Sequence, residues 1–99
     1  MVKVLIKRRY KPGKEKEVAA LLNEFRAGAL NRPGYISGIT LINAEDINVR
    51  LVIGTWESLE AWESWKESDT RRTFDKMIAV YQEGPTQYET YFTAPGRGA

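Results

Sequence analysis

Three tryptophans lie within ten consecutive positions of this 99-residue chain, and the stretch that holds them, residues 55–69, constrains the fold most. It begins at the end of an apolar, β-branched run, residues 51–56, of the kind that forms a buried strand. Ser58 then stands at the N-cap position of a short helix that carries Trp62 and Trp65, and Ser68 is placed to cap a second helix. The chain is therefore predicted to change here from a strand to two helices.

The other strands are predicted from period and composition. Apolar and polar side chains alternate over residues 2–10, which is typical of a half-buried strand. Residues 35–43 and 48–56 are rich in β-branched and aromatic side chains and are expected to form a hairpin. Residues 86–93 have the same character and are expected to be the last strand.

Two further segments have helical periodicity. Residues 14–30 combine one apolar stripe with a charged opposite face, and the helix is expected to end before Pro33-Gly34. Residues 70–81 are expected to form a helix whose apolar side chains all face inward: Phe74, Met77, Ile78 and Tyr81.

The order strand, helix, strand, strand, helix in two pieces, strand is the split βαβ pattern of ferredoxin-like α+β folds. We therefore expect a four-stranded antiparallel sheet with helices on one face, formed by residues 1–93 as a single domain, with residues 94–99 as a frayed tail. The hairpin strands are apolar on both faces, whereas a sheet with one wet face alternates more cleanly. We expect a homodimer through the sheet, a dimeric α+β barrel, to bury the second face.

Composition excludes several kinds of chemistry. The chain has no cysteine and no histidine, which removes disulfides, thiolate nucleophiles, thiolate metal sites, Ser-His-Asp triads and His-ligated haem. We expect no metal and no cofactor. The net charge of +2 is too small to indicate nucleic acid as a partner, and no apolar run reaches the roughly 18 residues of a membrane span. The protein is expected to be soluble and cytoplasmic, with no membrane partner.

A basic run, residues 7–11, lies on the first predicted strand. Because alternation sends its side chains to two faces, we interpret it as a charged sheet edge that discourages aggregation rather than as a phosphate site.

The spacing of the tryptophan stretch resembles the antibiotic biosynthesis monooxygenase family of dimeric α+β barrels. The matching residues are Trp56-Glu57-Ser58, Ala61-Trp62, Trp65 and Ser68, together with the turns Tyr10-Lys11-Pro12-Gly13-Lys14 and Arg32-Pro33-Gly34-Tyr35. The resemblance covers residues 2–93 and implies the fold. It does not imply one reaction, because the family includes cofactor-free oxygenases of polycyclic phenols and quinols, haem-degrading enzymes, isomerases and members of no known activity.

The haem-degrading branch is disfavoured residue by residue. In that branch a tryptophan in the position of Trp65 is followed ten residues later by the histidine that ligates iron, and an asparagine lies on the first strand. Here Asp75 stands in place of the histidine, and residues 2–10 contain no asparagine. A carboxylate in place of imidazole would change the chemistry of the iron.

The resemblance thus leaves a cofactor-independent monooxygenase of a phenolic or quinol molecule, in which an apolar pocket holds the substrate anion. Trp65 would form the wall over the aromatic substrate, Arg72 or Arg71 would stabilise the phenolate, and Asp75 would serve as a base. The candidate catalytic residues are Trp65, Arg72 and Asp75, and the candidate substrate-binding residues are Asn43, Trp62, Arg71 and Tyr81.

The alternative is a non-catalytic dimeric small-molecule-binding or stress-related module of the same fold, in which Trp62 and Trp65 fill the core. An open, apolar cavity that reaches Trp65, with an inward-pointing Arg71, Arg72 or Asp75, would favour the enzyme. A cavity filled by the large side chains of the helices would favour the module.

Overall fold

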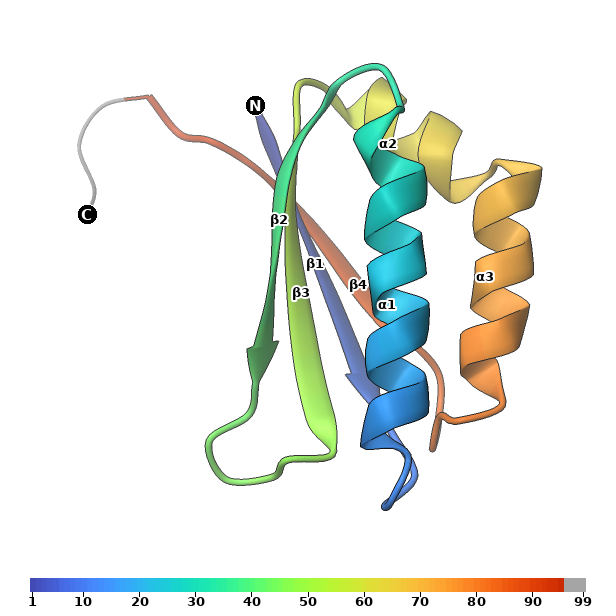
Figure 1. Ribbon diagram of the computed structural model, residues 1–99. Coiled ribbons are helices and arrows are strands. Elements are labelled where there is room, and N and C mark those ends of the chain that lie inside the picture. Colours follow the sequence, from blue (N-terminus) through green and yellow to red (C-terminus); the bar gives the residue numbers. More distant parts are fainter. Residues whose placement is uncertain (96–99) are drawn as a thin grey trace.

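A computed structural model describes residues 1–95 and shows one antiparallel sheet with helices on one of its faces (Figure 1). The strands are β1 (Val2–Arg9), β2 (Tyr35–Ile42), β3 (Val49–Trp56) and β4 (Gln87–Phe92), in the order β2-β3-β1-β4. The predicted ferredoxin-like α+β fold is therefore confirmed. Of the predicted tail, residues 94 and 95 lie outside any strand or helix, and residues 96–99 lie outside the described part.

The helices are α1 (Glu15–Leu30), α2 (Leu59–Lys66) and α3 (Asp69–Ala79). Both predicted caps are confirmed, because the Ser58 hydroxyl accepts from the Ala61 N–H at 3.1 Å and the Ser68 hydroxyl accepts from the Arg71 N–H at 3.2 Å. In Figure 1, α1 and α3 lie side by side over the sheet, and α2 crosses near one end. No helix in residues 1–95 is long and apolar enough to span a membrane.

Strand β1 is an inner strand, paired with β3 on one side and β4 on the other. Our interpretation of residues 7–11 as a charged sheet edge is therefore wrong. Arg8 lies in phase with Val2, Val4 and Ile6, so its side chain points to the helix face, where only 2% of it is exposed. Its cross-strand neighbour on that face is Arg50.

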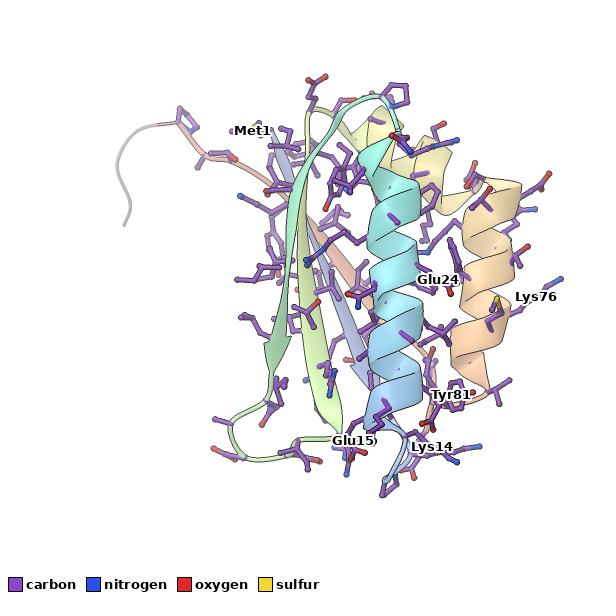
Figure 2. All side chains as sticks on the ribbon, in the orientation of Figure 1. Met1, Lys14, Glu15, Glu24, Lys76 and Tyr81 are labelled. Atoms are coloured by element: carbon purple, nitrogen blue, oxygen red, sulfur yellow. The ribbon has the colours of Figure 1, made fainter. Side chains whose placement is uncertain are left out.

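The core lies between the sheet and the helices in two clusters. One gathers the tryptophans around the apolar side chains of β1, and the other joins α1 to α3 through Phe25 and Ile78. Met77 was predicted to face inward, but it is 43% exposed. Its neighbour Ile78 is 1% exposed and takes the inward position, so the buried stripe of α3 passes to one side of Met77. In Figure 2, Lys76 points away from the helix layer on this outer side of α3.

On β2 and β3 the face of the sheet opposite the helices carries apolar side chains, as predicted, whereas on β1 the same face also carries Lys3 and Lys7. We call it the open face; it carries Leu5, Ile39, Leu41, Leu51 and Ile53. Ile39 is 53% and Leu41 is 42% exposed. Such contiguous apolar exposure on a sheet marks an interaction surface.

Candidate functional site

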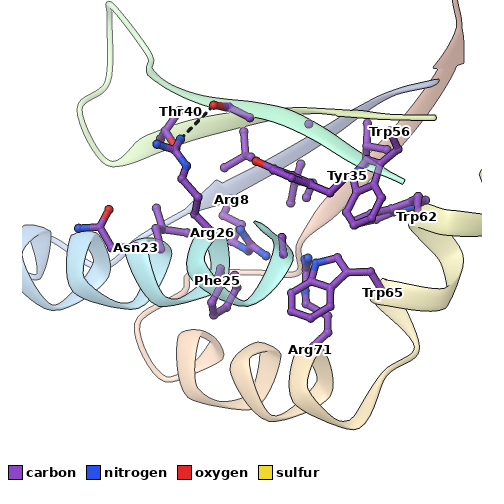
Figure 3. Close-up of a pocket in the computed structure, with 17 residues that line it drawn as sticks. Arg8, Asn23, Phe25, Arg26, Tyr35, Thr40, Trp56, Trp62, Trp65 and Arg71 are labelled. Carbon is purple, nitrogen blue, oxygen red and sulfur yellow. Dashed lines mark hydrogen bonds between the residues drawn. The ribbon is translucent and has the colours of Figure 1, made fainter. Parts of the chain in front are cut away.

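A cavity of about 80 Å³ lies between α1 and the helix face of the sheet (Figure 3). Its walls include the side chains of Tyr35, Trp56, Trp62, Trp65, Arg8 and Arg71. The strands supply Tyr35, Trp56 and Arg8, whereas α2 and the first turn of α3 supply the other three. The site is therefore assembled at the junction where the tryptophan stretch passes from β3 to the helices.

Two glycines leave room for two of the aromatic rings that line this space. A Cβ atom on Gly28 of α1 would lie 3.0 Å from Cη2 of Trp65, and a Cβ atom on Gly38 of β2 would lie 2.7 Å from the hydroxyl of Tyr35. In real proteins a Cβ atom essentially never lies 2.7 Å from another heavy atom, and at 3.0 Å the contact is crowded. The two rings occupy their places because these positions have no side chain.

Aromatic rings form a continuous wall. The Tyr35 and Trp56 rings meet edge to face with centroids 5.2 Å apart, and the Trp56 and Trp62 centroids are 5.9 Å apart. Trp62 is 3% and Trp65 is 2% exposed, so both belong to the core and also line the cavity. Outside the cavity, the Arg32 guanidinium lies 5.4 Å from the centroid of the Trp65 ring. This packing holds the indole in place.

The inner end of the cavity is basic. Arg71 is 3% exposed; its Nε donates to Oδ1 of Asp75 at 2.9 Å, and its Nη2 lies 3.4 Å from the Tyr88 hydroxyl. The Nη2 atom of Arg8 lies 3.9 Å from the same oxygen of Asp75, which is an ion pair but too long for a hydrogen bond. Within residues 1–95, neither Nε nor Nη2 of Arg8 has a hydrogen-bond partner. Both guanidinium groups also lie over Phe25, at 5.5 Å for Arg8 and 5.3 Å for Arg71.

The mouth of the cavity faces solvent between α1 and β2. There the exposed Arg26 reaches across and donates from Nη2 to the Gly38 carbonyl at 3.2 Å (Figure 3). Burial raises the pKa of Tyr35 above its ordinary value, although the nearby positive charge of Arg26 acts in the opposite direction. Tyr35 is therefore a neutral phenol near pH 7 and can donate a hydrogen bond.

Three of the predicted site residues, Trp62, Trp65 and Arg71, come together around the cavity. Asp75 does not line it; this residue is 35% exposed and binds Arg71 one helical turn away along α3. Its carboxylate therefore orients the arginine from behind.

The other three predicted site residues do not line the cavity. Arg72 follows Arg71 by one residue, about 100° around the helix, and is exposed. Asn43 is exposed in the β2–β3 hairpin, where its Oδ1 accepts the N–H groups of two residues that follow it. Tyr81 follows α3 at the end of the molecule where α1 begins, and its carbonyl accepts from the Lys11 N–H at 2.8 Å (Figure 2).

Sequence reasoning missed Arg8 and Tyr35. The signal for Arg8 was its phase, since a cation at an even position of β1 shares the face of Val2, Val4 and Ile6. Alternation alone does not show that β1 is an inner strand, which is what buries this side chain.

Comparisons with known proteins agree with this architecture. The sequence model of the antibiotic biosynthesis monooxygenase family matches residues 1–77. A conserved protein from Methanosarcina mazei Go1 superposes with a TM-score of 0.84 at 18% identity, covering 91% of this chain and 89% of that chain. A mutant of SnoaB, a cofactor-independent oxygenase from Streptomyces nogalater, superposes with a TM-score of 0.83 at 14% identity, covering 97% of this chain and 94% of that chain.

A solved antibiotic biosynthesis monooxygenase gives a TM-score of 0.85 at 17% identity and covers 96% of this chain and all of its own. At these identities the superpositions show the shared fold. No curated protein sequence matches the chain. The family match spans well over half of the residues and includes the tryptophan stretch, Arg8 and Arg71. On this evidence, the chain belongs to the antibiotic biosynthesis monooxygenase family.

Proposed function

We propose that the protein is a cofactor-independent monooxygenase that acts on a small phenol or quinol bound in the cavity. One observation carries the proposal: the cavity reaches Trp65, and the buried cation Arg71 lies on its wall. An open cavity with an inward-pointing cation favours a reactive pocket over a filled core. A structural neighbour that is a cofactor-independent oxygenase supports the same class of reaction.

In the proposed reaction the substrate supplies both electrons, so no cofactor is needed. The positive charge of Arg71 favours the ionised phenol, whose anion passes an electron to O₂. The two radicals combine by forming a C–O bond at a ring carbon that bears hydrogen, and the peroxide takes up the proton that the phenol lost. The O–O bond and the C–H bond of that carbon then break together; the hydroxide that leaves takes the carbon-bound proton to form water, and a quinone remains. Trp62 and Trp65 hold the ring and keep water from the intermediates.

The test is O₂ consumption with a panel of quinols and anthrone-like phenols. We expect Arg71→Ala to lower the rate by about 100-fold, the usual effect of losing one donor to a developing oxyanion. Trp65→Phe should lower the rate less, because the ring wall is shortened but not removed. Arg72→Ala is the matched control and should react like the parent, since the side chain is exposed and lies outside the cavity. A parent protein that consumes no O₂ with any member of the panel would refute the proposal.

The second candidate function is a non-catalytic binding module. It is favoured by the lining of the cavity, which among the described residues includes no carboxylate to act as a base. The module would bind small aromatic molecules and consume no O₂. The two candidates therefore give opposite results in the same assay.

We also propose that the open face packs on the open face of a second copy. Its exposed leucine and isoleucine side chains support this proposal, because two such surfaces related by a two-fold axis would bury each other. Ile39→Lys should convert a dimer into a monomer in sedimentation at micromolar concentration, because a lysine in the centre of the interface would be buried without a partner. A parent that sediments as a monomer contradicts this proposal.

A further inference from the structure

Arg8 is the most unusual group at the site because its charge is buried and part of its hydrogen-bonding capacity is unused. Its side chain is 2% exposed, and its Nε and Nη2 atoms have no hydrogen-bond partner among the described residues. Leaving such donors buried is costly, and more so for a charged group. Figure 3 shows that Arg8 enters the cavity from the sheet side, facing α1.

The two unpartnered atoms define the shape of the missing acceptor. Nε and Nη2 lie on the same side of the planar guanidinium group, so their N–H groups form a fork. That fork matches the two oxygens of a carboxylate, which it binds through parallel hydrogen bonds. A single neutral oxygen would have to accept both N–H groups at once, without the two parallel, charge-assisted bonds that a carboxylate makes.

The charges around Arg8 point to an anion as well. Arg8 and Arg71 share one carboxylate, Asp75, which is itself held by Arg71. This buried cluster therefore carries one positive charge in excess, and Arg50 adds another beside Arg8 on the neighbouring strand. A monoanion would neutralise the excess of the cluster.

The rest of the cavity favours an aromatic body behind the anionic group. Its walls are the indole rings of Trp56, Trp62 and Trp65. At about 80 Å³ it is far smaller than the several hundred Å³ of pockets for drug-sized ligands. It therefore suits one ring, and any larger body would extend past Arg26 to solvent.

We propose that the Nε–Nη2 edge of Arg8 binds the carboxylate of a monoanionic aromatic acid whose ring packs against Trp62 and Trp65. This inference rests on the cavity of the proposed function and names the class of molecule that enters it. For the enzyme, the substrate is a phenol or quinol that also carries a carboxylate. Arg8 anchors the carboxylate, and Arg71 remains beside the reacting oxygen.

The test is titration calorimetry with benzoate and with its neutral isostere benzamide, supported by the fluorescence of the three tryptophans, all of which line the cavity. Benzoate should bind at least ten times more tightly than benzamide to the parent, by the order of magnitude of one charge-assisted hydrogen bond. Arg8→Met should weaken benzoate binding by about thirty-fold or more, which is typical when one partner of a buried charge pair is lost. Arg8→Lys keeps the charge but loses the fork, and should also weaken binding.

Arg9→Met is the matched control, because Arg9 is adjacent, half exposed and on the opposite face of the sheet, where it pairs with Asp46. It should bind benzoate like the parent. Equal affinity of the parent for benzoate and benzamide would overturn the inference without any variant, so the test remains valid even if Arg8→Met does not fold. Benzoate binding by Arg8→Met equal to that of the parent would overturn it too, as would a crystal structure in which Asp75 moves to within about 3 Å of Arg8, a full hydrogen bond, and excludes the ligand.

The binding and O₂-uptake experiments can refute the two proposals separately. A protein that oxidises neutral quinols but shows no preference for benzoate keeps the proposed function and refutes this inference. A protein that prefers benzoate and loses that preference in Arg8→Met, yet consumes no O₂ with neutral quinols or with quinols that carry a carboxylate, supports the inference and refutes the oxygenase.

Discussion

Replacement of Arg8 by methionine should stabilise the protein in the absence of ligand. The folded state buries two N–H donors of Arg8 without acceptors, at a cost of about 1–3 kcal/mol each. Against this stand the packing over Phe25, worth about 0.5–2 kcal/mol, and a 3.9 Å ion pair with Asp75. Because Asp75 is 35% exposed, solvent screens that pair and makes its contribution small.

Methionine keeps an unbranched chain of similar length over Phe25 and removes both the unpaired donors and the like-charge opposition to Arg50. We expect a net gain of about 1–2 kcal/mol in the free energy of unfolding, in the range found when buried charges are replaced by apolar groups. For a domain of this size that gain raises Tm by about 5–15 °C.

The assay is urea denaturation together with a thermal melt, on the parent, Arg8→Met and Arg9→Met. Arg9→Met should change stability much less, because Arg9 is half exposed on the other face. The same concentration of benzoate should raise the Tm of the parent much more than that of Arg8→Met. A fall of more than about 1 kcal/mol in the free energy of unfolding of Arg8→Met would refute the reasoning. That is the net contribution of an ordinary hydrogen bond, so such a fall would mean that the guanidinium group is hydrogen-bonded in the folded protein.

Three other changes probe the cap, the glycine and the buried phenols. Ser68→Ala should lower the free energy of unfolding by about 1 kcal/mol through loss of the α3 cap, measured by urea denaturation; no change would mean that the cap is dispensable. Gly28→Ala should gain up to about 1 kcal/mol of helix propensity, while its new Cβ displaces the Trp65 ring that lines the cavity. Thermal stability should therefore hold and benzoate affinity should fall; unchanged affinity would contradict this. Burial raises the pKa of Tyr10 and Tyr35 above 10.0, with nearby arginines opposing it, so the folded state retains both protons longer than the unfolded state. This contribution to the free energy of unfolding is fully present below about pH 10 and is lost as the pH rises further. Urea denaturation from about pH 8 to 11 should show the fall in the free energy of unfolding, and the fall should be smaller in Tyr10→Phe.

The sequence alone determined the elements and their order. Ser58 and Ser68 cap helices through hydrogen bonds to groups three residues away, so the signal and the structure lie in the same short segment. The alternation over β1 and the apolar character of both faces of the hairpin strands are equally local. The tryptophan spacing carried the family resemblance for the same reason.

The candidate site could be predicted only in part. Trp62, Trp65 and Arg71 lie on the tryptophan stretch or directly after it, where sequence and space nearly coincide. Asn43, Arg72 and Tyr81 were chosen for their chemistry, and chemistry does not say which way a side chain points. A rotation of about 100° along α3 separates the buried Arg71 from the exposed Arg72.

Only the tertiary structure decided that Arg8 is buried and that the cavity exists. The order β2-β3-β1-β4 places β1 inside the sheet, and packing of α1 over it turns an arginine of a basic run into a buried cation with two unused donors. The rings of Trp65 and Tyr35 can line the cavity because Gly28 and Gly38, at other positions of the chain, leave room for them. The physical reason is that burial and charge pairing depend on groups distant in sequence, whereas caps and periodicity depend on neighbours.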